Sequence, residues 1–283
     1  MTTAAAPSMA DVVRTIGDLP SLPAVVVELL SSMEQEDIDT HILANKIALD
    51  QSLAAKTLRL ANSSFYGMSS KVTTIHQAIS VLGFHSIRTL VTACSLTGSF
   101  TPTAVDAFDF KAFWRQSVAT AVIAKLLAVR YRINAETAFT AGLLHDIGML
   151  VLATRFPSDY AQVLATRRAD DCYLIEAEQK VFGLDHAHVG SALAAHWKFP
   201  LAIQKAVEQH HGEHGPTVTL ALVVHAANIL AHALDLCATY DDLAPPMSDA
   251  VWTALALSEQ DAKVLFASGE TMFNDMCTIL LNP

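Results

Sequence analysis

Residues 143–148 read LLHDIG, an apolar run that ends in an adjacent histidine and aspartate, His145 and Asp146, followed by Gly148. A neutral imidazole and a carboxylate on neighbouring residues can approach one divalent ion together when the local backbone holds them. A buried aspartate also needs such a partner, because an unpaired carboxylate is costly to remove from water. The stretch therefore predicts a polar site within an apolar and helical part of the chain.

The histidines of the chain gather downstream of this pair. Nine of the twelve lie between His145 and His232, and His186, His210 and His211 fall at the ends of later expected helices. Two interpretations are open from the residues alone. These side chains can bind a metal ion with Asp146, or they can hydrogen-bond to one another and to helix amides and so fix the packing.

The remaining histidines of this region favour simpler roles. His225 and His232 lie three residues before and four residues after Asn228, on one face of an expected helix, where we expect packing ahead of metal binding. We expect three others at the surface or at helix ends, namely His188, His196 and His214.

The composition favours an all-α protein with a large core. Hydrophobic residues make up 52% of the 283 residues and charged residues only 16%, which excludes intrinsic disorder. Apolar residues recur with helical spacing, and no alternating strand pattern of convincing length is present. We therefore expect helices that are buried on most of their faces.

Charge and cysteine usage restrict the partners and the compartment. The formal net charge of −10 opposes nucleic acid or an anionic membrane as the default partner. The four cysteines form no C-x-x-C pair and no export signal is visible, so we expect a cytoplasmic protein. Residues 214–234 lack Lys, Arg, Asp and Glu, but their three histidines favour a buried helix over a membrane span.

Residues 98–110, GSFTPTAVDAFDF, interrupt the helical periodicity and predict a boundary. We divide the chain into an N-terminal helical module (1–105), a second helical domain (106–240) and a C-terminal helical extension (241–283). In the second domain we expect helices at 111–131, 135–154, about 158–168, 171–182, 186–196, 200–211 and 217–236. Ser258 and Asp261 resemble a capping box at the start of a late helix.

Several motifs together resemble the HDOD family (HD-related output domain), a degenerate branch of the HD phosphohydrolase superfamily found in bacterial signalling proteins. The resemblance covers about residues 18–236. It rests on LPSLPAVVVELL at 19–30, on the string from Asp50 to Gly67, on QAISVLG, on FWRQS, on LLHDIG, on FGLDHAHVGSALAAHWKFP at 182–200 and on His210-His211. It implies an N-terminal helical module packed on a degenerate HD-type domain.

Catalytic HD enzymes hold metal with an early histidine, the HD pair and a late aspartate. Carried over to this chain, the resemblance places the early histidine at Gln116 and the late aspartate at Asn228, and both residues are neutral amides, which are poor ligands for transition ions. The pocket is therefore expected to be vestigial, without catalytic residues. The expected pocket consists of Gln116, His145, Asp146, His186, His210, His211 and Asn228, of which the histidines and Asp146 are the metal ligands if any metal binds.

Residues Asn62, Phe65 and Tyr66 form a candidate docking site, with two alternatives. The segment can be a structural turn that pins the first module to the second, with Gly67 at positive φ. The preceding helix can also imitate a helix-turn-helix with Lys56 and Arg59, although two basic residues neutralise few phosphates.

We expect a non-catalytic signalling output or adaptor protein that acts through contacts with signalling proteins. No cofactor is required by this expectation, although a divalent metal can occupy the pocket. The alternatives are a metal-dependent phosphohydrolase or phosphodiesterase, which the retained ligands favour and Gln116 and Asn228 oppose, and a DNA-binding regulator.

Overall fold

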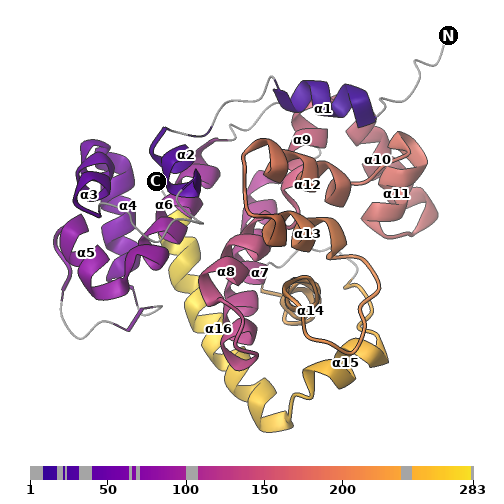
Figure 1. Ribbon diagram of the computed structural model, residues 1–283. Helices are drawn as coiled ribbons and strands as arrows, with labels where there is room; N and C mark the ends of the chain where they lie inside the picture. Colours follow the sequence, from indigo (N-terminus) through magenta and orange to yellow (C-terminus); the bar gives the residue numbers. More distant parts are fainter. Residues whose placement is uncertain are drawn as a thin grey trace.

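The computed structural model (Figure 1) describes residues 9–17, 22, 24–31, 40–63, 66–67, 71–99, 108–236 and 244–281. All regular secondary structure in these residues is α-helical, as the sequence predicts. The helices of the first part are α1 (Met9–Gly17), α2 (Ala24–Ser31), α3 (Thr40–Leu49), α4 (Gln51–Ala61), α5 (Ile75–Leu82) and α6 (Phe84–Ser99).

The helices after the interruption are longer and more deeply buried. They are α7 (Phe110–Arg130), α8 (Ala135–Leu144), α9 (Ile147–Arg155), α10 (Pro157–Asp170), α11 (Leu174–Phe182), α12 (His186–His196), α13 (Leu201–Gln209), α14 (Leu220–Ala233), α15 (Asp249–Leu255) and α16 (Glu259–Leu280). Helix α12 matches its expected range. The expected helix over 135–154 is instead broken at His145-Asp146 into α8 and α9, which frees the Asp146 side chain from a continuous helix surface.

The helix ends are set by capping residues that can be recognised in the sequence. Asp50 caps α4 by accepting a hydrogen bond from the Leu53 amide, and Asp109 caps α7 in the same way through Ala112. Gly83 ends α5 at a φ of +80°, which a residue without a Cβ adopts without strain. Ser258 and Asp261 form the expected capping box of α16.

Helix α7 is the centre of the second part. It packs against α8 on one side and α14 on another, and α16 runs along it as well (Figure 1). Phe110–Arg130 and Ala135–Arg155 are long and apolar enough to cross a bilayer, but 72% and 78% of their apolar windows are buried inside the protein. These two stretches, the second of which comprises α8 and α9, are therefore part of the core of the bundle.

Two terminal helices connect distant parts of the chain. Helix α1 packs on α12, where Val12 and Ile16 are buried, so it lies beside the second half of the molecule (Figure 1). Helix α16 contacts α7 and also α4 and α6, and it thereby joins the two halves.

A buried polar cluster also joins the halves, and we call Tyr66, Ser86, Arg88, Lys125 and Glu136 the inter-module cluster. The Lys125 ammonium on α7 lies 2.7 Å from the Glu136 carboxylate on α8 and 4.6 Å from the centre of the Tyr66 ring. Ser86 on α6 donates to the same carboxylate oxygen at 3.3 Å. Arg88 is 5% exposed, stacks on a phenylalanine ring, and has Nε and Nη1 buried without a hydrogen-bond partner.

Candidate functional site

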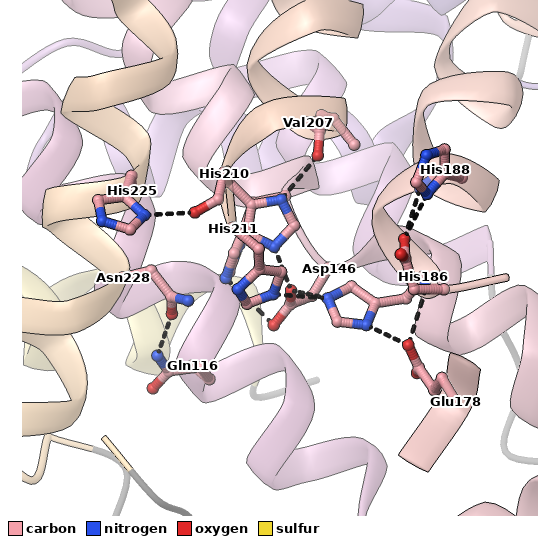
Figure 2. A network of polar contacts seen from close by, with 12 residues as sticks. Gln116, Asp146, Glu178, His186, His188, Val207, His210, His211, His225 and Asn228 are labelled. Carbon is pink, nitrogen blue, oxygen red and sulfur yellow. Dashed lines mark hydrogen bonds and ion pairs between the residues drawn. The ribbon is translucent and has the colours of Figure 1, made fainter. Parts of the chain in front are cut away.

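The candidate site is assembled from three places in the second half of the chain. Asp146 lies in the break between α8 and α9, His186 is the first residue of α12, and His210 and His211 directly follow α13. Figure 2 shows their side chains gathered around the Asp146 carboxylate. The structure thus brings together five residues that the sequence singles out, and we call His145, Asp146, His186, His210 and His211 the histidine cluster.

The distances within the histidine cluster are short. The Nε2 atoms of His186 and His210 each lie 3.2 Å from Oδ1 of Asp146, and Nε2 of His145 lies 3.1 Å from Oδ2. Nε2 of His211 is 3.0 Å from Nε2 of His186. One potential ligand atom from each of Asp146, His186, His210 and His211 lies within 4.8 Å of all the others, so one ion can reach all four.

The Nδ1 atoms of three imidazole rings of the histidine cluster hydrogen-bond to fixed acceptors. Nδ1 of His145 lies 2.8 Å from the Gly142 carbonyl, and Nδ1 of His210 lies 2.6 Å from the Val207 carbonyl. Because a carbonyl oxygen only accepts, each Nδ1 carries the proton, and a neutral ring then turns the Nε2 lone pair inward.

His186 is held by a carboxylate instead. Its Nδ1 lies 2.6 Å from Oε2 of Glu178, and the same oxygen accepts from the His186 backbone amide at 2.8 Å. Glu178 is fully buried on α11. A carboxylate that orients a histidine from behind is a common second partner of metal-binding histidines. Sequence reasoning missed Glu178, and its only signal is an acidic residue on the face of α11 that also carries Ala177 and Phe182.

The interior of the histidine cluster is crowded with hydrogen-bond acceptors. Nε2 of His145, Nε2 of His210 and Oδ1 of Asp146 are all buried without a hydrogen-bond partner. The short contacts from these imidazoles to Asp146 become hydrogen bonds only when the rings are protonated. A cation in their midst satisfies all these acceptors at once, and the nitrogen and oxygen donor set suits a borderline divalent ion.

The pKa values of the buried histidines are shifted in different directions. Burial alone would raise the pKa of Asp146, but His145, His186 and His210 hold it well below its usual range. Burial would also lower the pKa of His186, yet the Glu178 and Asp146 carboxylates raise it well above its usual value. Burial lowers the pKa of His210 to about 4, and burial with the neighbouring imidazoles lowers that of His211 strongly. The shifts therefore favour the protonated ring at His186 and the neutral ring at His210 and His211.

Two glycines place His186 beside Asp146. A Cβ atom at Gly148 would lie 2.0 Å from the His186 carbonyl oxygen and 2.6 Å from the Gly190 amide nitrogen. A Cβ atom at Gly190 would lie 2.9 Å from a Val207 methyl group. The backbones of α9 and α12 are thus in direct contact, and only glycine permits this approach.

The two amides of the expected pocket bind each other. Nε2 of Gln116 on α7 donates to Oδ1 of Asn228 on α14 at 2.9 Å, and both side chains are buried (Figure 2). The pair lies next to the histidine cluster, and its hydrogen bond joins two core helices. The side chains at the two carried-over ligand positions are therefore neutral and engaged with each other.

The other histidines of the region differ in exposure. His225 is half-buried, donates from Nδ1 to the His210 carbonyl at 2.6 Å, and has its ring 4.7 Å from that of His214. His188 and His196 are exposed, as expected. His214, His225 and His232 line a cavity that starts at the histidine cluster, a feature that sequence reasoning did not anticipate.

At the turn after α4, the described contacts are internal. The Asn62 side chain donates to the Leu58 and Val72 carbonyls and accepts from the Val72 amide, each at 2.8 Å. Tyr66 packs on Lys125, and Gly67 has a φ of +58°. These contacts favour the structural alternative for Asn62 and Tyr66, whereas Phe65 lies outside the described residues.

The helix-turn-helix alternative depends on the exposed side of α4. Arg59 donates to the Thr278 carbonyl at 3.3 Å, and α4 packs on α5, α6 and α16. The basic side chain nearest the end of this helix is therefore directed at α16.

Comparisons with known proteins agree with this architecture. A family model described as HDOD domain matches residues 19–213. A provisionally named phosphohydrolase from Shewanella amazonensis SB2B is 30% identical, with a TM-score of 0.71 over 95% of this chain and 98% of that one. A provisionally named signal transduction protein from Marinobacter aquaeolei VT8 shares the fold at 22% identity and a TM-score of 0.72, over 100% of this chain and 63% of that one.

A curated relative has a different length. An uncharacterized protein from Treponema pallidum (strain Nichols) is 26% identical over 247 residues, which is 86% of this chain. The chain spans about half of that relative, 47% of its length.

Proposed function

Because the chain belongs to the HDOD family, we propose that it is a non-catalytic, cytoplasmic signalling output or adaptor protein that acts through contacts with protein partners. In this proposal the histidine cluster holds a divalent metal ion as a structural or ligand-binding element, without turnover. Among the similar proteins, the name of the signal transduction protein is compatible with this proposal, whereas the name of the phosphohydrolase corresponds to the enzyme alternative.

The observation that carries the proposal is the hydrogen bond between Gln116 and Asn228. HD enzymes, as the sequence resemblance implies, need a histidine and an aspartate at these positions to complete their primary metal site. A carboxylate at position 228 would add negative charge that balances the metal, and an imidazole at position 116 would add a ligand. The amide pair supplies neither, because its facing polar atoms satisfy each other.

The metal part of the proposal is supported by the acceptors that converge without partners. Asp146, His186, His210 and His211 would hold the ion, with His145 beside them and Glu178 orienting His186. A bound divalent ion supplies Lewis acidity toward an oxyanion. The residues of this chain contribute rigid orientation, because three of the Nδ1 atoms are hydrogen-bonded to fixed acceptors.

The test compares four proteins by calorimetric titration with manganese, iron, nickel and zinc. These are the wild type, Gln116→His, Asn228→Asp and the double variant. We expect the wild type to bind one ion, and the double variant to gain more than the sum of the singles by about 1 kcal/mol or more, because both residues serve one ion. The control pair Gln260→His and Asn274→Asp makes the same changes at exposed positions of α16 and should leave affinity unchanged.

The same proteins are assayed for hydrolysis of nucleotides and cyclic dinucleotides. The wild type should show no turnover with any of the four metals. Robust wild-type turnover would overturn the adaptor function in favour of the phosphohydrolase alternative. Absence of metal binding in all four proteins would remove the metal part and leave the histidine cluster as packed core.

A further inference from the structure

A cavity of about 590 Å³ opens directly from the histidine cluster. Its inner end is formed by Asp146, His186 and His211, and it passes the face of α14 that carries His225 and Asn228. This volume lies within the range of cavities that enclose a small organic molecule. The cavity therefore gives the proposed metal ion a space in which a ligand can reach it.

The charged residues on the described wall of the cavity differ in exposure. Arg167 on α10 is half-buried and is the one arginine or lysine among the described wall residues. Besides Asp146, the described wall carries one carboxylate, Glu213, which is exposed. With a divalent ion on Asp146, the positive charges of the described wall outweigh the negative ones. This balance favours an anionic ligand group.

The rest of the wall is largely apolar. Tyr173, Leu174 and Ile175 line one part, and Pro245, Pro246 and Val251 line another. Proline rings and an aromatic ring present flat apolar surfaces, which suit the planar or hydrocarbon body of a ligand. A bare inorganic anion would leave these surfaces in contact with water.

Part of this wall comes from outside the region that the family model matches. That match ends at residue 213, whereas residues 245–251 lie at and just before the start of α15. Helix α15 is anchored in the core by Val251 and Leu255. The shape of the cavity is therefore set in part by residues that lie outside the region matched by the family model.

We propose that the cavity binds an organic anion, in which a phosphate or carboxylate group reaches the metal ion and Arg167 and an apolar or aromatic body contacts Tyr173 and the 245–251 segment. This inference rests on the proposed function, because it uses the metal ion of the histidine cluster. It adds the chemical class of the ligand and assigns Arg167 as a specificity residue.

The test uses the full chain loaded with manganese and four probes in calorimetric titrations: phenyl phosphate, benzoate, inorganic phosphate and phenol. We expect one or both aryl anions to bind at least about tenfold more tightly than inorganic phosphate or phenol, since burial of the ring adds apolar contact. Phenyl phosphate against benzoate tells which anionic group the cavity prefers. Equal binding of all four probes, or binding of none, would overturn the proposal.

Two variants separate the anion contact from the apolar contact. Arg167→Gln should weaken aryl anion binding about tenfold, the effect of losing one charge-assisted hydrogen bond, while Arg168→Gln on the exposed side of the same helix should have no effect. Ala250→Trp fills the cavity from an exposed position and should weaken the aryl probes while sparing inorganic phosphate. Equal effects of Arg167→Gln and Arg168→Gln would contradict the assignment of Arg167.

Binding of manganese is measured separately from binding of the aryl anions. A protein that binds manganese but no aryl anion refutes this inference and leaves the proposed function intact. A protein that binds aryl anions through Arg167 without manganese keeps Arg167 and refutes the metal part. Release of phenol from phenyl phosphate by the wild type would refute the non-catalytic function itself.

Discussion

The histidine cluster and the inter-module cluster both contain polar atoms that are buried without a hydrogen-bond partner, but the kinds of atom differ. In the histidine cluster these atoms are Nε2 of His145, Nε2 of His210 and Oδ1 of Asp146, which can all act as acceptors. In the inter-module cluster, Lys125 pairs with Glu136, whose charge also acts on Arg88, and the atoms without a partner are Nε and Nη1 of Arg88 and Oε2 of Glu136. Converging acceptors can be satisfied by a cation, whereas a mixture of donors and acceptors can be satisfied by water.

Position distinguishes the two clusters further. The histidine cluster lines a cavity of about 590 Å³, so a ligand can reach it. The inter-module cluster is enclosed where α6, α7 and α8 meet, and it ties the first half of the chain to the second. In our proposal, one buried polar network serves ligand binding, whereas the other attaches the first half of the chain to the second.

The largest expected effect comes from disrupting the geometry of the histidine cluster without touching a ligand. Gly148→Ala would place a methyl group 2.0 Å from the His186 carbonyl oxygen, and α12 must then move away from α9. We expect a loss of about 3 kcal/mol in the free energy of unfolding, typical of severe overpacking, together with loss of metal binding.

Urea unfolding and metal titration measure this effect. Gly215→Ala is the matched control, because a Cβ atom there has no neighbour within 4 Å. A Gly148→Ala protein with wild-type stability would mean that the contact between α9 and α12 relaxes easily.

The next effect concerns the inter-module cluster. Glu136→Gln leaves the half-buried Lys125 without its carboxylate and removes the negative charge that acts on the buried Arg88, and we expect a loss of about 3 kcal/mol in the free energy of unfolding because an uncompensated buried charge is costly. Lys125→Met should cost less, since the charge of Glu136 then still acts on Arg88. Metal affinity at the histidine cluster should stay at the wild-type value.

Chemical unfolding checks the order of these two variants. Glu259→Gln is the control, because it breaks an exposed ion pair with Lys263 that contributes little. If Lys125→Met were the more damaging change, the charge of Glu136 would not stabilise both cations.

The smallest expected effect is on the pH dependence of the free energy of unfolding, in which the two clusters should differ. Burial, with the neighbouring His225, lowers the pKa of His214 to about 4, below its usual value near 6.5. The unfolded chain therefore binds this proton more readily, and stability is lost as the pH falls from about 6.5 toward 4. His214→Gln should reduce the slope of unfolding free energy against pH in that window, measured without metal.

The inter-module cluster contains no histidine and should not contribute to this slope. Its pKa shifts lie elsewhere: burial lowers the pKa of Lys125 and raises that of Tyr66. His188→Gln, at an exposed position, is the control for the His214 variant. An unchanged slope in His214→Gln would show that this imidazole does not contribute to the acid sensitivity.

Much of the fold could be predicted from local patterns, because capping residues and apolar periodicity act over a few residues. Gly83, the Ser258 capping box and the range of α12 are examples. The break at His145-Asp146 could not, because the apolar run continues through it and the interruption is stabilised by contacts with α12 and α13.

The candidate site also contains residues that could be predicted from the sequence and residues that could not. The histidines and Asp146 could be singled out from residue type and resemblance, because they gather downstream of the HD pair. Glu178, Arg167 and the 245–251 segment could not be found in this way, because only the packing of α10, α11 and α15 around the cavity brings them there. Nothing in their local sequence distinguishes them from ordinary surface or core residues.

The hydrogen bond between Gln116 and Asn228 also constrains how this sequence can evolve. Each amide is the buried partner of the other, so replacing one alone leaves the second with an unsatisfied polar group, at a cost of about 1–3 kcal/mol. A chain that acquired the histidine and the aspartate one substitution at a time would pass through one of these destabilised intermediates. The pair therefore opposes single substitutions toward the metal-binding residues of HD enzymes, and both positions would have to change together.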